Sequence, residues 1–131
     1  MALTHRVSTT VRSNAGSVTS TSYTLTGTHE FNLELTDKSI ATDTLQDMVA
    51  DVSTIVSLAI ESDVAMTLET NSNTGAGGDV LTLVANTPVI WNTTIAATTG
   101  AVCPLTTDVT ALYITNAAIG DLSIYILFNG S

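Results

Sequence analysis

The chain has 131 residues, enough for one domain with a hydrophobic core, and 44% of them are hydrophobic while only 11% are charged. Twelve Asp and Glu residues outnumber three Lys and Arg residues, so the formal net charge is −9. Three cations cannot neutralise a nucleic-acid backbone or bind an anionic membrane surface, which excludes both as partners. The single cysteine, Cys103, excludes an intramolecular disulfide and a cysteine-based zinc site.

The N-terminal region is polar and has no apolar run of the kind found in signal peptides, so we expect synthesis in a cytoplasm without export. Residues 4–12 and 18–26 are rich in Thr and Ser. They predict an edge pair of strands, or strands that lie against a neighbouring subunit. An Asn-Ala-Gly turn signal at residues 14–16 separates them. We therefore divide the chain into an N-terminal arm or edge strand, residues 1–14, and a single β-sandwich domain, residues 15–131.

Residues 29–35 alternate strictly between polar and apolar side chains, which predicts a half-buried antiparallel strand. Its apolar face holds Phe31, Leu33 and Leu35, and its polar face begins with Glu30.

The segment at residues 43–52 departs from this alternation. Its apolar residues Leu45, Met48, Val49 and Val52 follow the i, i+3, i+4, i+7 spacing of an amphipathic helix. A Thr-x-x-Asp pattern in the same stretch resembles a weak capping box. We expect a short helix or an irregular crossover here.

Five later segments alternate or form short apolar strands, and turn signals separate them at the spacing of sandwiches and barrels. These segments are residues 64–70, 80–84, 89–91, 111–114 and 121–128. Residues 57–68 and 111–124 also share a strand–polar turn–strand pattern, which predicts two hairpins in the two halves of a Greek-key sandwich. Together the patterns predict an all-β fold, an antiparallel β-sandwich of jelly-roll type with roughly eight strands.

The chemistry-bearing residues give no support for catalysis. A hydrolytic triad needs a nucleophile, a base and an acid within hydrogen-bond reach, and His5 and His29 are the only histidines. Cys103 has no neighbouring cluster of positive charge to activate it. The Asn- and Gly-rich loop at residues 71–79 brings one carboxylate, Asp79, which is too few for a calcium loop. We expect a non-enzymatic protein with no cofactor and no metal site.

Four segments of the chain carry a resemblance to a known family. They are residues 58–63, 67–72, 79–91 and 103–116, and the most specific parts are the Pro-Val-Ile-Trp step at 88–91 and the run at 104–116. Through these segments the chain resembles the small virion proteins of tailed bacteriophages, of the capsid cement or head-decoration type. The resemblance covers a little over half of the chain and does not extend to the first 50 residues. The helical spacing within residues 45–52 departs from the strand that the family would have there.

The resemblance implies a non-catalytic β-sandwich or jelly roll on the exterior of the virion, made in the host cytoplasm. Such a protein binds the major capsid protein in the assembled shell and stabilises that shell by mass action. The resemblance also implies a homo-oligomer, most often a trimer. We expect the N-terminal arm to contact the capsid or neighbouring subunits, through these residues: Leu3, His5, Arg6, Val7 and Arg12.

Two other functions remain open from the residues. One is another virion part, such as a tail-tube, tail-fibre or head–tail joining protein. The other is a carbohydrate-binding β-sandwich for host attachment, for which Trp91 with Asn92 is the candidate sugar contact. Packing of Trp91 in the core is the simpler interpretation of that residue.

Overall fold

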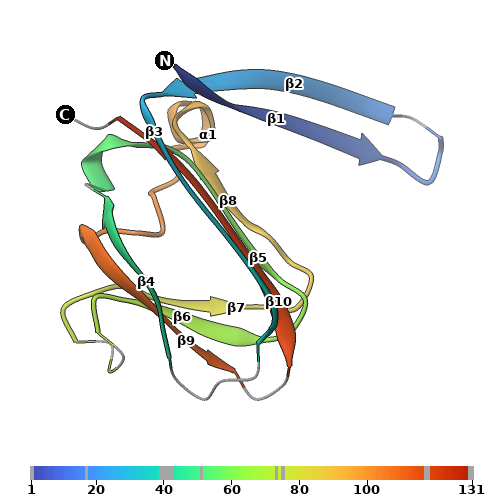
Figure 1. The fold of residues 1–131 in the computed structure, drawn as a ribbon. Helices are drawn as coiled ribbons and strands as arrows, with labels where there is room; N and C mark the ends of the chain where they lie inside the picture. Colours follow the sequence, from blue (N-terminus) through green and yellow to red (C-terminus); the bar gives the residue numbers. More distant parts are fainter. Residues whose placement is uncertain are drawn as a thin grey trace.

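The computed structural model describes residues 2–16, 18–38, 43–50, 52–72, 74, 76–116 and 119–129. Over these residues the chain forms a two-layer β-sandwich from which one long hairpin projects (Figure 1). The hairpin consists of β1 (Leu3–Arg12) and β2 (Val18–Gly27), which pair antiparallel.

The sandwich consists of two four-stranded sheets. In spatial order, the first sheet contains β3 (His29–Lys38), β10 (Gly120–Phe128), β5 (Ile55–Ser62) and β8 (Val89–Asn92). The second sheet contains β4 (Asp43–Ala50), β9 (Val109–Asn116), β6 (Met66–Thr70) and β7 (Val80–Leu83). A 3-10 turn, η1 (Val52–Thr54), precedes β5, and a short helix, α1 (Thr93–Thr99), follows β8.

The strand order is that of a jelly roll. All neighbouring strands are antiparallel, and from β3 to β10 the chain changes sheet at each connection except β6–β7. This winding of eight strands into two sheets corresponds to two Greek keys. The prediction of an all-β antiparallel sandwich of jelly-roll type with roughly eight strands is therefore confirmed. The hairpin strands β1 and β2 are additional to the eight strands of the sandwich.

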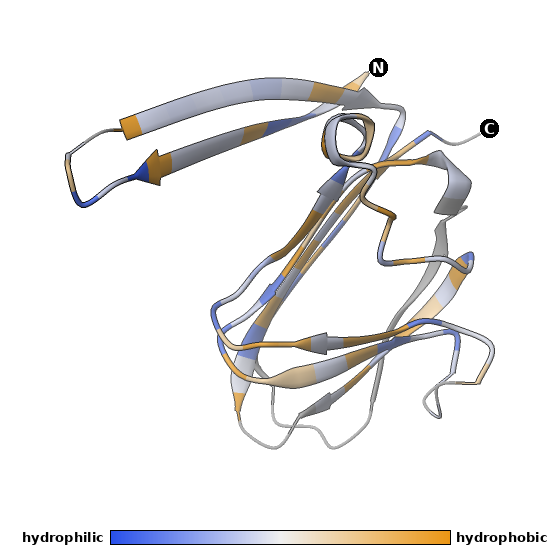
Figure 2. Cartoon of the chain, turned by 180° about the vertical axis from the view of Figure 1, so that it is seen from behind, coloured by the Kyte–Doolittle hydropathy of each residue, from blue (hydrophilic) through white to orange (hydrophobic). Residues whose placement is uncertain are grey.

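Apolar side chains from both sheets fill the space between them. Leu58, Leu112 and Ile124 are among those with no more than 1% of their surface exposed. The alternation of β3 is confirmed, since Phe31 and Leu33 pack against this core together with Leu35. Figure 2 shows the same division, with apolar positions alternating along the sandwich strands while most of the hairpin is pale.

The two strand–turn–strand stretches are corners between the sheets, so the prediction of two hairpins is wrong. β5 and β10 pair in the first sheet, whereas β6 and β9 pair in the second. At the corner, the Asp121 backbone N–H donates to Asp63 Oδ1 over 2.7 Å. Gly120 is needed there, because a Cβ atom would lie 2.2 Å from Val64 Cγ2. A polar turn marks a change of direction, but only the partners of each strand decide whether the chain stays in its sheet.

The helix expected within residues 43–52 is also wrong, because residues 43–50 form strand β4 beside β9. The ladder is irregular at two places: Thr44 and Gln46 oppose the adjacent residues 113 and 112, and a second shift separates Asp47 from Ala50. Each bulge inserts a residue and breaks the period of two. A helix of this length is marginal by itself, whereas β9 supplies a partner for the strand.

The structural boundary between hairpin and sandwich lies at Thr28, between β2 and β3. The turn signal at residues 14–16 predicts a boundary at residue 14 instead. That signal marks the tip of the hairpin, where Gly16 has a φ of 86° and its N–H donates to the Ser13 carbonyl. The arm therefore contains both Thr- and Ser-rich segments.

Candidate functional site: the hairpin and the sheet beneath it

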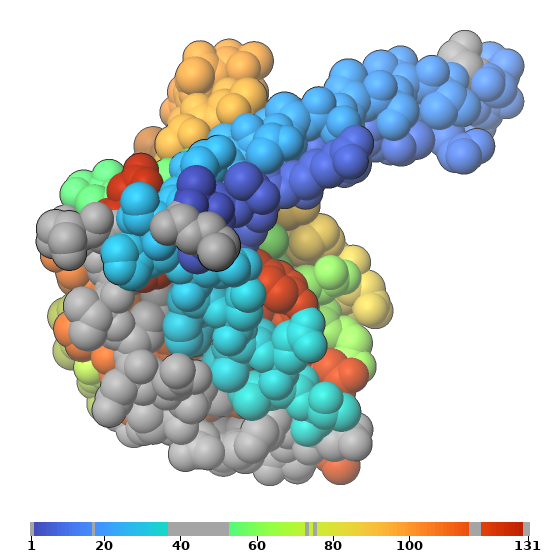
Figure 3. Space-filling model, turned by 45° about the horizontal axis from the view of Figure 1, so that its top comes forward, coloured from blue at the N-terminus to red at the C-terminus, as the bar shows by residue number. Residues whose placement is uncertain are grey.

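The hairpin has a base that contacts the sandwich and an outer half that does not. Its ten residue pairs run from Leu3 opposite Gly27 to Arg12 opposite Val18. Near the base, Leu25 is buried, whereas every described residue from 8 to 22 is exposed. The space-filling view shows this outer half standing clear of the body (Figure 3).

Asn92 anchors the base of the hairpin. Its side chain is completely buried, and its Nδ2 donates to the Tyr23 hydroxyl over 2.9 Å. Its Oδ1 accepts the Ile95 N–H over 2.8 Å and so caps α1. One amide therefore joins β2, β8 and the helix.

Close contact between Gly27 and Leu127 also anchors the base. A Cβ atom at Gly27 would lie 2.8 Å from Leu127 Cγ, which leaves no room for a side chain. Leu127 is fully buried although its neighbours Leu122, Ile124 and Ile126 supply the core side of β10. The hairpin base therefore covers an apolar side chain on the outer face of the first sheet.

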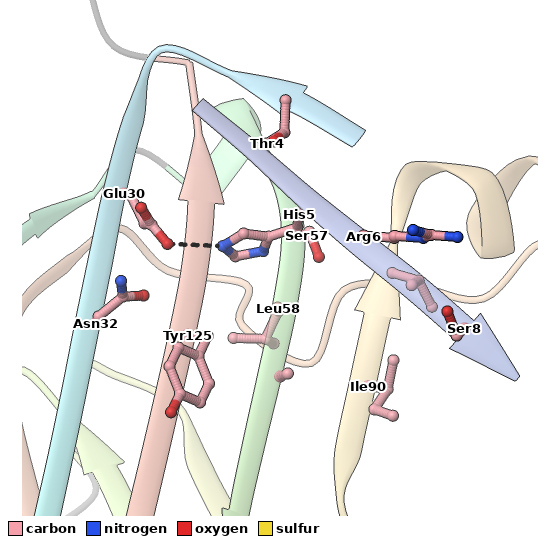
Figure 4. Close-up of a pocket in the computed structure, with 12 residues that line it drawn as sticks. Thr4, His5, Arg6, Ser8, Glu30, Asn32, Ser57, Leu58, Ile90 and Tyr125 are labelled. Atoms are coloured by element: carbon pink, nitrogen blue, oxygen red, sulfur yellow. Dashed lines mark hydrogen bonds and ion pairs between the residues drawn. The ribbon is translucent and has the colours of Figure 1, made fainter. Parts of the chain in front are cut away.

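His5 connects β1 to the edge of the same sheet. Its Nε2 lies 3.2 Å from Glu30 Oε1 on β3, the ion pair drawn in Figure 4. A hydrogen bond from Asn32, followed by that from His5, lowers the pKa of Glu30 below its ordinary value. Both contacts favour the charged carboxylate at the edge of the hairpin base.

The opposite face of the hairpin is cationic and points away from the sandwich. Side chains alternate along a strand, so Arg6 and Arg12 lie on the face opposite His5. Arg6 extends away from Glu30 (Figure 4), and its Nη2 donates to Ser22 Oγ over 3.3 Å. Hydroxyl groups of Thr and Ser occupy most of the remaining positions on this face.

Charge is divided sharply between the hairpin and the sandwich. All twelve Asp and Glu residues lie at or after Glu30, whereas Arg6 and Arg12 precede it and Lys38 follows it. Residues 1–29 therefore carry a formal charge of +2 and residues 30–131 carry −11, which together give the −9 of the chain. The position of Arg6 and Arg12 near the N-terminus is visible in the sequence, whereas their place on one face of a projecting hairpin is visible only in the structure.

A groove of about 440 Å³ lies between β1 and the outer face of the first sheet (Figure 4). Tyr125, Ala59 and Ile90 line it from the sheet, where Tyr125 is opposite Ala59 and Ala59 is opposite Ile90. The Tyr125 hydroxyl donates to Glu34 Oε1, and this hydrogen bond raises the pKa of Tyr125. The groove thus combines an aromatic ring, an apolar floor and the carboxylate of Glu30 at one side.

The structure divides the five predicted contact residues into two groups. Leu3, His5 and Val7 are half-buried and lie on the face of β1 toward the sandwich, while Arg6 and Arg12 are exposed on the other face. The sequence did not predict the groove residues. Tyr125 on β10 and Ile90 on β8 lie on the same sheet face as the polar side chains of β3 only because these strands are neighbours in the first sheet.

Trp91 and Asn92, the residues expected to contact a sugar, both make contacts within the protein. Trp91 packs against the core, and its Nε1 donates to the Ala101 carbonyl over 3.0 Å. Asn92 is the buried anchor described above. Asn92 is therefore inaccessible to a sugar ring, whereas Trp91 is half-buried.

Asp79, the carboxylate of the 71–79 loop, joins this loop to residues 106–107. It accepts three hydrogen bonds, from the N–H and hydroxyl of Thr106 and from the N–H of Thr107, at 2.6 to 3.0 Å. Burial by itself would raise the pKa of Asp79, but these hydrogen bonds outweigh it and the pKa is lowered. Among the described residues no group of three or more His, Cys, Asp and Glu side chains is placed to hold a metal ion.

Cys103 is half-buried beside the core, and burial raises the pKa of its thiol. A thiol with a raised pKa is a poor nucleophile at neutral pH.

The fold and the site together define a jelly-roll β-sandwich protein with a projecting, positively charged hairpin. Comparisons of the chain with protein-family models, with curated proteins and with solved structures find no match. In the part of the chain that the structure describes, no helix has the length and apolar character needed to cross a membrane.

Proposed function

We propose that this protein is a non-catalytic structural component of a virus particle, a cement or decoration protein that binds the assembled capsid as a homo-oligomer. The observation that supports this proposal best is the unsupported outer half of the hairpin. It extends beyond the sandwich, and those of its residues that the structure describes are exposed and contribute nothing to the core. Its role is to connect the subunit to a neighbour.

A two-stranded ribbon is only marginally stable in water when nothing packs on it. The outer half of this hairpin consists mainly of Thr and Ser, with exposed Val11 and Val18 and one unpaired edge on each strand. Unpaired edges and strand-forming residues are suited to extended contacts with another chain. A partner protein in the virus particle would pack against the outer half of the hairpin, which the sandwich of the same chain does not contact.

The rest of the fold suits such a connector. Jelly rolls are common in viral capsid and lectin domains, and the buried anchor at Asn92 holds the hairpin at a defined angle to the sandwich. A protein that binds only the assembled shell stabilises that shell by mass action. The resemblance to phage cement proteins points to the same role.

Sedimentation with capsid shells tests this function. The wild-type protein should co-sediment with assembled shells of a candidate major capsid protein and not with its free subunits. In a shortened variant, a two-residue Asn-Gly turn replaces residues 9–21. This turn connects Ser8 to Ser22, its partner in the β1–β2 ladder. This variant keeps the anchored base, and we expect it to lose most of its occupancy on shells.

The outcomes separate the parts of the proposal. Undiminished occupancy of the shortened variant would contradict the role of the hairpin. Failure of the wild-type protein to bind any shell would contradict the cement function, and assembly of the pure protein into tubes would favour a tail-tube protein instead.

Sugar binding is a second candidate, because the groove places Tyr125 beside Asn32, Glu34 and Ile90. Aromatic rings with amide and carboxylate neighbours are suited to sugar recognition. Binding of wild-type protein but not of a Tyr125→Ala variant on a glycan array would support this function. Absence of binding by the wild-type protein would remove it.

A further inference from the structure

We propose that the outer half of the hairpin docks on the acidic outer face of the first sheet of a second copy of this chain. The inference rests on the proposed function of the hairpin as a connector between subunits, and it names the partner. The two surfaces have opposite charge, and both belong to the same molecule.

The docking element is the cationic face of β1. Arg12 lies at the exposed end of the strand, and Arg6 lies six residues before it on the same face, about 20 Å away. His5 forms an ion pair with Glu30, whereas neither Arg6 nor Arg12 forms one with any carboxylate that the structure describes. The hairpin has no acidic residue that would repel a carboxylate partner.

The receiving surface is the part of the first sheet that the hairpin base leaves uncovered. Strand register places Glu34 and Glu61 on either side of Ser123, two strand spacings or about 10 Å apart. Next to this row lie Tyr125 and Ile90, of which Ile90 is 49% exposed. The surface thus presents two carboxylates beside an apolar strip, without a Lys or Arg among these residues.

The two surfaces cannot meet within one molecule. The hairpin projects away from the sandwich (Figure 1), and strand alternation places Arg12 on the same face as Arg6, which extends away from Glu30 (Figure 4). A second copy can supply the missing surface. Because the hairpin of one copy contacts the sheet of the next, the contact is head-to-tail and forms a closed ring where the rotation between copies allows it.

Attraction across this contact must overcome the repulsion between two chains of charge −9. At about 0.15 M salt the Debye length is about 8 Å, so distant charges are largely screened while charges in contact are not. The contact is therefore expected to form near physiological salt, and it depends on individual charges at the interface.

Charge exchange between variants tests the contact on the purified protein. Arg12→Glu and Glu61→Lys should each weaken self-association at least about tenfold in sedimentation velocity, because each places like charges opposite one another. An equimolar mixture of the two variants should associate again. In that mixture the hairpin tip of each variant can contact the sheet of the other variant, where the substituted or native side chain has the opposite charge.

Matched controls change the net charge elsewhere. Thr82→Glu/Val84→Glu and Thr82→Lys/Val84→Lys make the same changes in net charge at exposed positions in and just after β7 of the second sheet, and we expect them to associate like the wild type. Circular dichroism should show unchanged folding for all four variants, as expected at exposed positions.

Three results would overturn the inference. The first is a wild-type protein that stays monomeric up to about 1 mM. The second is association that Arg12→Glu and Glu61→Lys weaken no more than the controls do. The third is a mixture of the two variants that stays dissociated. None of these experiments contains capsid protein, so their failure is distinguishable from a failure of shell binding.

Discussion

At the scale of single residues, Asn92 shows how a buried polar side chain positions an external feature. Its amide makes two hydrogen bonds of 2.8 and 2.9 Å in a site with no exposed surface, one to the start of α1 and one to Tyr23. Loss of a buried partner costs more than the net contribution of the hydrogen bond, because the remaining group is left unsatisfied. One amide outside the hairpin therefore helps to hold the hairpin at its angle to the sandwich.

We expect Asn92→Ala to lower the free energy of unfolding by about 1–3 kcal/mol, through loss of the helix cap and of the Tyr23 contact. Asn92→Ser retains a capping oxygen but is too short to reach Tyr23, so its effect should be intermediate. Urea unfolding measures both, with the exposed Thr93→Ala as control. Equal stability of the Ala variant and the wild type would show that the amide does not anchor the hairpin.

At the scale of secondary-structure elements, β1 and β2 depend on different interactions at their two ends. The base is held by Asn92, by the Gly27–Leu127 contact and by the His5–Glu30 pair. The described residues from 9 to 21 contact each other, through the ladder and through hydroxyl contacts such as Thr9 with Thr21 at 3.1 Å. The outer half can therefore be removed without disturbing the sandwich.

The shortened variant with Asn-Gly in place of residues 9–21 tests this independence. We expect its free energy of unfolding to stay within about 0.5 kcal/mol of the wild-type value, because the removed residues contribute no buried apolar surface to the core. Chemical denaturation of monomeric protein measures the difference. A loss of several kcal/mol would mean that the outer half supports the sandwich.

At the scale of the whole molecule, stability is expected to be concentrated in the middle of the sheets. β10 and β5 each have strands on both sides and supply fully buried residues such as Ile124 and Leu58, whereas β7 and β8 are edge strands. Local opening requires least free energy where few apolar contacts are broken. The protein thus combines a rigid body with a hairpin whose outer half is ordered only by its own pairing.

Hydrogen–deuterium exchange on the monomeric Arg12→Glu variant should reveal this gradient. Amides of the outer hairpin should exchange fastest, and amides of β5 and β10 slowest. In the wild-type protein at high concentration, protection of the outer hairpin should increase as copies associate. Strong protection of the outer hairpin in the monomeric variant would contradict the separation of the two parts.

Local patterns in the sequence determined the class of fold and the buried face of β3, because alternation in a strand reports directly which side chains meet the core. The same local reasoning failed at residues 43–50, where pairing with β9 and two bulges outweighed a helical spacing, and at the corners beside Asp63 and Gly120. The tertiary structure alone decided which residues form the site. Tyr125, Glu34 and Ile90 are far apart in the chain, and they share a surface only because the jelly-roll winding places β10 between β3 and β5, with β8 beyond. Strand order is set by the burial of both sheets together, which no single stretch of sequence encodes.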